Sequence, residues 1–184
     1  MANKVKFGIK NVYYAVATEG TGGALTYGTP VAIPGARSIS LSASGDTSSW
    51  YADNVVYFST AANNGYEGDL AVALIPDSFR VDVLGEVLDT KGFYVESTNK
   101  PTVEFALMFQ FEGDESAVRH CFYRCTATRP QIDGNTVEET IEPQEETITI
   151  TAMPRINDGV IKSRCPADAT PYNAWFTAVQ EPTA

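Results

Sequence analysis

The chain has 184 residues, of which 43% are hydrophobic and 20% are charged, and its formal net charge at pH 7 is -10. This length is enough for one domain with its own hydrophobic core, and the composition excludes an intrinsically disordered chain. The negative charge excludes tight binding to nucleic acid, because the protein surface would on average repel a phosphate backbone.

The N-terminal residues predict neither a secretory signal nor a membrane anchor. Lysines interrupt every apolar run in residues 1–10, MANKVKFGIK, so the apolar region of a signal peptide is missing. The longest apolar runs further along are residues 71–76 and 105–109, which are much shorter than the roughly 20 residues of a membrane-spanning helix. We therefore expect no export by that route and no membrane segment.

Apolar residues recur with a period of two in much of the chain. The alternating segments are residues 12–16, 39–41, 70–74, 103–111 and 148–152. Successive side chains of a strand point to opposite faces of its sheet, so this pattern predicts an antiparallel sheet system. The clearest segment, 103–111, is predicted to be a half-buried strand.

The first long segment without a regular pattern is Ser42–Gly65, which we expect to be a long loop. It carries Trp50, Tyr51, Tyr57 and Phe58 between polar turn-forming residues. Long ordered loops in compact domains are usually functional, and aromatic residues are enriched where proteins bind one another. The aromatic side chains therefore belong either to a binding surface or to the core of the subunit itself.

A short helix is predicted directly after the strand that contains residues 70–74. Pro76 ends the strand, Asp77 is a candidate N-cap, and the helix runs to Leu84 with its apolar residues on one face. Gly85 can take the left-handed conformation that follows a helix end.

Residues 117–128 are predicted to be a strand that is covered on both faces and pairs with 102–112 through a loop at 112–116. This strand holds Cys121 and Cys125, which should share a face about 13 Å apart, too far for a disulfide. Together with Cys165 there are three cysteines, which cannot all form disulfides. Because a protein without a signal peptide is normally made in a reducing compartment, we expect free thiols.

The region after residue 128 is predicted to hold an acidic loop or hairpin and then a C-terminal element. Residues 129–146 carry six carboxylates and no basic residue after Arg129. This pattern indicates a solvated charged segment and not a calcium loop. Near the C-terminus, Thr170 as cap and Pro171 as first helical residue favour a helix over 172–179, although the same residues also fit a strand.

The groups that catalysis requires are largely missing from the sequence. His120 is the one histidine, it lies within a predicted strand, and no nucleophile motif accompanies it. His120 and the three cysteines do not have the paired spacing of a zinc site. We therefore expect no enzyme activity, no metal and no cofactor.

Three segments give the chain a family resemblance: GIKNVYYAVATEG at 8–20, YGTPVAIPGARSISLSASGD at 27–46 and YEGDLAVALIPDSFRVDVLGE at 66–86. Together they resemble the major tail proteins of long-tailed, non-contractile bacteriophages of Gram-positive hosts. The strand, proline, short helix and glycine of 66–86 occur in that family's order. The similarity extends over almost the whole chain.

The resemblance implies a mainly β, tail-tube-like sandwich or barrel with one or two short flanking helices, in a single domain over 1–184. It also implies a structural virion protein, made and assembled in the host cytoplasm, that forms stacked hexameric rings around a channel for double-stranded genome DNA. Its partners would be other copies of itself together with tail initiator, tape-measure and terminator proteins.

Two surfaces follow from this role as hypotheses. Trp50, Tyr51, Tyr57 and Phe58 would contact the neighbouring ring. Glu104, Glu112 and Asp114 would give an acidic channel wall that repels passing phosphates, while residues 133–146 fit either side of the wall. The alternative function is a soluble β-sandwich that binds a carbohydrate or a protein, which the strands and tyrosines fit equally well.

Overall fold

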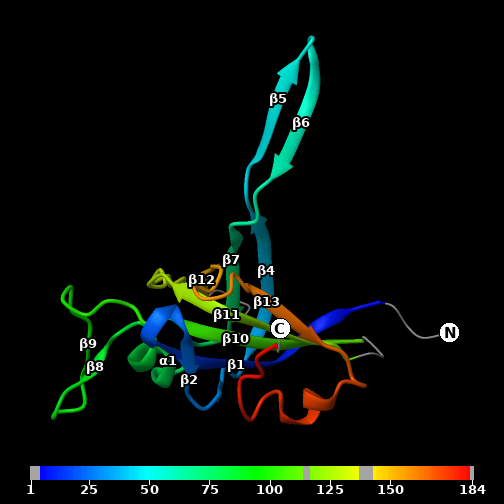
Figure 1. Cartoon of the computed structure of the whole chain (residues 1–184). Coiled ribbons are helices and arrows are strands. Elements are labelled where there is room, and N and C mark those ends of the chain that lie inside the picture. Colours follow the sequence, from blue (N-terminus) through cyan, green and yellow to red (C-terminus); the bar gives the residue numbers. More distant parts are fainter. Residues whose placement is uncertain (1–4, 114–116, 137–142, 183–184) are drawn as a thin grey trace.

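The protein was analysed as a computed structural model, which describes residues 5–113, 117–136 and 143–182. The fold is mainly antiparallel β, as predicted, and the described residues include one short α-helix (Figure 1). The elements in chain order are β1 (Phe7–Glu19), η1 (Thr21–Gly23), β2 (Leu25–Tyr27), β3 (Val31–Ala32), β4 (Ala36–Ser44), β5 (Thr47–Ala52), β6 (Val55–Ala61), β7 (Gly65–Val72), α1 (Asp77–Asp82), β8 (Val87–Leu88), β9 (Tyr94–Val95), β10 (Phe105–Glu112), β11 (Arg119–Ala127), β12 (Glu146–Ala152), β13 (Lys162–Cys165) and η2 (Thr170–Ala174).

One large sheet forms the body of the molecule. Its strand order is β2-β1-β10-β11-β12-β7-β4, with β3 added to β1 and β13 added to β11. Every pairing in it is antiparallel, and β10 pairs with β11 as the sequence predicts. The sheet curls so that β4 comes back beside β1, which encloses a core.

The inner core lies inside this curl and receives side chains from most of the strands. Tyr14, Leu70, Leu107, Phe122 and Ile150 are buried there, each from a different strand. The alternation of apolar residues explains this arrangement, because every second side chain of each strand points inward. Ile39 and Leu41 of β4 close the core at the end of the sheet.

The outer face of β1, β10 and β11 is covered as well. Ala106, Met108, Cys121 and Tyr123 form an outer cluster with Trp175 from the C-terminal segment. The prediction that 103–111 is half-buried is therefore wrong, since Phe105–Gln110 are all buried. The cover comes from residues that lie more than 50 positions further along the chain, as the Trp175 Nε1–His120 O hydrogen bond shows.

A β-bulge in β11 places its two cysteines on opposite faces, and the prediction that they share one face is wrong. Phe105 pairs with Cys125, but Leu107 pairs with Phe122, so β11 has one more residue than β10 between these pairs. The extra residue reverses the alternation. Cys121 consequently lies in the outer cluster and Cys125 in the inner core, both as free thiols, and burial raises the pKa of each.

Helix α1 occurs where it was predicted, although its N-cap differs and it ends at Asp82, before the predicted end at Leu84. Pro76 occupies the N-cap position, so Asp77 is the first helical residue and its side chain does not cap the helix. Phe79 is buried, Gly85 has a φ of 79°, and Tyr14 fastens the helix to β1 by donating a hydrogen bond to Asp82 at 2.8 Å. Burial raises the pKa of Tyr14 to about 12, so its hydroxyl keeps the proton that it donates.

The C-terminal element is neither an α-helix nor a strand. Residues Thr170–Ala174 form the 3-10 turn η2, with Ala169 and not Thr170 at the N-cap. Tyr172 and Phe176 lie against the outer cluster, where Arg119 stacks on the Tyr172 ring at 3.7 Å and Tyr13 stacks on Phe176 at 4.9 Å. These ring contacts hold the segment to the sheet.

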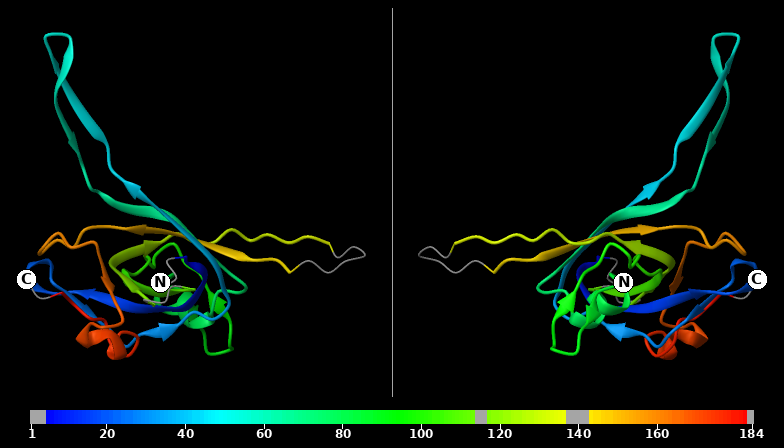
Figure 2. Two further views of the ribbon diagram at one scale, coloured as in Figure 1. Left: turned by 90° about the vertical axis from the view of Figure 1, so that its right-hand side faces the viewer. Right: turned by 90° about the vertical axis from the view of Figure 1, so that its left-hand side faces the viewer.

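The long loop expected over residues 42–65 is instead a two-stranded hairpin, formed by β5 and β6. It continues from β4 and β7 and projects far from the body (Figures 1 and 2). The described parts of the acidic segment, 129–136 and 143–145, contain no strand or helix and extend away from the body in another direction (Figure 2). A further short hairpin, β8–β9, lies at one side of the body, beyond α1 and away from β5–β6 (Figure 1).

Candidate assembly interface

The projecting hairpin, residues 47–61, is called the arm. Its outer part, the tip, carries Trp50, Tyr51, Tyr57 and Phe58, and all four side chains are exposed, Tyr57 to 72%. Trp50 and Tyr57 pack edge to face at 5.8 Å, and they contact no other ring of the described residues. The alternative that these aromatic residues complete the subunit's own core is therefore wrong.

The part of the arm next to the body, the stalk, is polar. Ser48 pairs with Thr60 and Ser49 pairs with Ser59, whose hydroxyls lie 3.4 Å apart. Polar side chains of the stalk can remain in contact with water. Exposed clusters of large apolar side chains, such as those of the tip, mark binding surfaces. The described residues of the subunit thus leave the apolar part of the arm exposed.

The turn of the arm is built by residues suited to it. Ala52 pairs with Val55, which leaves Asp53 and Asn54 as a two-residue turn with φ values of 51° and 63°. Asp and Asn are the non-glycine residues that tolerate this left-handed conformation best, and such turns match the twist of a hairpin. The arm is a defined structure and not an unpatterned loop.

A comparison with known protein families bears on this surface. A family model described as a phage tail tube protein matches residues 2–179. The chain belongs to the phage tail tube protein family. Its members are structural tail proteins and not enzymes, and the resemblance read from the sequence is confirmed. A search among curated proteins found no match. The Gram-positive host stays a prediction.

The carboxylates predicted to face the channel of the tail tube protein lie apart from the arm. Glu104 is bound by Arg124, with Nη2 and Oε1 at 2.7 Å, and Glu112 is bound by Lys10 at 3.1 Å. Asp114 lies outside the described residues. Glu104 and Glu112 each carry a neutralising partner, so neither adds a net negative charge to its surroundings.

Strand β4 leaves an edge of the sheet open in the tail tube protein. It pairs with β7 on one side, and no strand of the described residues pairs with its other side. Serines alternate along its outward face at Ser38, Ser40, Ser42 and Ser44. Because β1 lies beside β4 across the curl without pairing with it, only the part of this edge that extends beyond the body toward the arm (Figure 1) offers unpaired backbone groups to a neighbouring chain.

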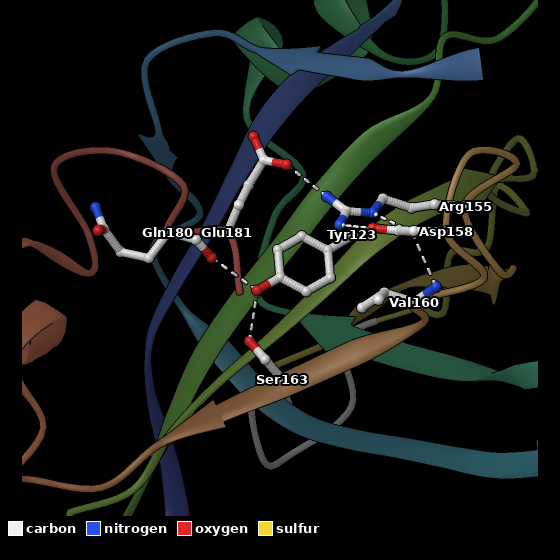
Figure 3. Close-up of polar contacts among 7 residues, drawn as sticks. All are labelled: Tyr123, Arg155, Asp158, Val160, Ser163, Gln180 and Glu181. Carbon is white, nitrogen blue, oxygen red and sulfur yellow. Dashed lines mark hydrogen bonds and ion pairs between the residues drawn. The ribbon is translucent and has the colours of Figure 1, made fainter. Parts of the chain in front are cut away.

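A buried arginine holds the C-terminal residues to the body, and the sequence offered no motif for it. Arg155 hydrogen-bonds both oxygens of Asp158 and reaches Glu181 at 2.6 Å (Figure 3). Tyr123 donates to the Gln180 carbonyl at 2.7 Å, and its hydroxyl also lies 2.6 Å from that of Ser163. The Arg155 contacts hold the pKa of Asp158 below its usual value.

Arg155→Ala should lower the free energy of unfolding by about 2 kcal/mol, because charge-assisted hydrogen bonds and the packing over Tyr123 are lost. The matched control is Arg37→Ala, since Arg37 pairs with Glu145 at the surface and such a pair contributes less than about 1 kcal/mol. Urea denaturation measures both. Equal losses in the two variants would contradict the assigned role of Arg155.

The described residues contain no group of three or more side chains arranged to hold a metal ion. Cys121 and Cys125 lie on opposite faces of β11, so they cannot bind one ion together. His120 stacks on Phe109 at 5.2 Å within the sheet. In the described part of the chain, no helix has the length and apolar character needed to cross a membrane.

Proposed function

We propose that the chain, as a single domain, assembles into hexameric rings that stack into the phage tail tube, and that genome DNA passes through this tube. The observation that carries the proposal is the arm, whose apolar tip is held away from the body by a polar stalk. An exposed apolar surface of this kind marks an interaction site, and in a tube the partner that covers it would be the next ring.

Two further features support a closed wall. The open edge of β4 is suited to joining a neighbour within the ring, because closure of a sheet removes its unpaired edges. The net charge of -10 favours a wall that repels phosphates and does not bind them. Since Glu104 and Glu112 are paired, this repulsion would come from the total charge more than from these residues.

In this role the protein has no catalytic activity and resides in the virion tail after assembly in the host cytoplasm. Its partners are other copies of the chain and the initiator, tape-measure and terminator proteins of the tail. The family match to residues 2–179 weighs against the alternative of a soluble carbohydrate- or protein-binding module.

The test is sedimentation and negative-stain microscopy of the purified protein across concentration, with and without tail initiator proteins. We expect six-fold rings in projection and tubes at high concentration or after initiation. A chain that stays monomeric under all of these conditions would contradict the proposed function.

A further inference from the structure

A second exposed apolar surface lies on the β8–β9 hairpin, residues 86–96, which we call the finger. Val87, Leu88, Phe93, Tyr94 and Val95 are all exposed there. The finger is well defined, because Asp89 accepts hydrogen bonds from the backbone amides of Lys91 and Phe93, each at 2.8 Å. An apolar surface on a fixed hairpin indicates a binding site.

The finger and the arm project from different parts of the body. The arm rises from the ends of β4 and β7, and the finger lies at one side of the body, beyond α1 and away from the arm (Figures 1 and 2). A stack in which every copy has the same orientation joins two different surfaces of the subunit. The arm and the finger meet this requirement, whereas two arms cannot meet each other in such a stack.

Opposite charges lie at the turns of the two hairpins. The arm contains Asp53 at its turn and neither lysine nor arginine anywhere in residues 47–61. The finger carries one lysine, Lys91, exposed at its turn, and three carboxylates: Glu86 pairs with Arg80, Glu96 pairs with Arg129, and Asp89 accepts the two backbone hydrogen bonds described above. No described acidic side chain of the subunit forms an ion pair with Lys91. Opposite charges at the ends of two apolar hairpins set the register in which the hairpins pack.

We propose that the arm tip of one copy docks on the finger of a second copy in the adjacent ring, with Asp53 facing Lys91. The aromatic side chains of the tip then cover Phe93 and Tyr94. This proposal rests on the proposed function and adds the surface that receives the arm.

Charge reversal tests the pairing directly. Asp53→Lys and Lys91→Asp should each raise the subunit concentration needed for tube formation by about tenfold, since each places like charges in contact. The double variant D53K/K91D should return to within about threefold of the wild type. Lysine in the left-handed turn has the same cost in D53K and in the double variant, so this comparison isolates the charge pair.

A disulfide reports the contact itself. Oxidised tubes of D53C/K91C should give a ladder of covalent multimers, because each chain would be linked at both ends. D53C or K91C alone should give no species beyond a dimer, and the native cysteines are buried. When no tubes are present, oxidising a mixture of D53C and size-tagged K91C should give clearly more of the mixed disulfide dimer than random pairing of the two variants would give.

The outcomes separate the two proposals. The docking on the finger would be overturned if the wild type forms tubes but D53K/K91D does not rescue the single variants and oxidised D53C/K91C tubes give no ladder. The tube function would then remain intact. A statistical yield of mixed dimers would overturn the docking even where no tubes grow. Failure of the wild type to assemble would count against the tube function itself.

Discussion

Replacing both Trp50 and Phe58 by serine is expected to abolish tube formation while the subunit keeps its fold. The two residues face each other on β5 and β6 and are 60% and 59% exposed. Burying each in an interface contributes about 1.5–3 kcal/mol, so their joint loss weakens every stacking contact by about 100-fold or more. In the proposed tube each subunit of a ring makes this contact, so the effect would multiply along the tube.

The measurements are sedimentation and electron microscopy for assembly, with circular dichroism and thermal unfolding for the fold. The matched control is S49A/S59A, which changes the polar stalk of the same hairpin and removes only an exposed hydroxyl contact. We expect the control to assemble as the wild type does. Tubes of W50S/F58S at the wild-type concentration would show that the tip is not the stacking surface.

Gly68→Ala is expected to have the largest effect on the fold itself. Gly68 lies in β7 between Leu41 of β4 and Ile150 of β12, so both neighbours are fixed by the sheet. A Cβ atom at this position would lie 1.8 Å from the Ser40 carbonyl oxygen, which is far inside contact distance. Relief requires moving β4 away from β7, and we expect a loss of about 3 kcal/mol or more in the free energy of unfolding.

Urea denaturation of the soluble fraction measures this loss, and a shift of the chain into the insoluble fraction would show a larger one. Gly134→Ala is the control, because nothing lies within 4 Å of a Cβ atom there. Its stability should stay within about 0.5 kcal/mol of the wild type. A G68A protein as stable as this control would mean that β4 does not pack on β7 as described.

The arm shows why its structure could not be predicted from local pattern. A strand is recognised when one face is apolar and the other polar, but the tip is apolar on both faces and the stalk is polar on both. The pairing of Trp50 with Phe58 and of Tyr51 with Val56 also leaves Tyr57 as an extra residue, which interrupts the alternation. The finger, in contrast, could have been predicted as a hairpin from the sequence, because apolar residues flank the turn-forming residues Asp89 and Gly92.

The sequence by itself determined the antiparallel strands, the position of α1, the pairing of β10 with β11 and the family. These features depend on neighbours in the chain: alternating side chains, a proline before the helix and a glycine after it. Only the tertiary structure decided which faces are buried and where Cys121, Arg155 and the arm lie. The physical reason is that burial depends on contacts between distant residues, such as Trp175 over β11, and on a single bulge that reverses every side chain beyond it.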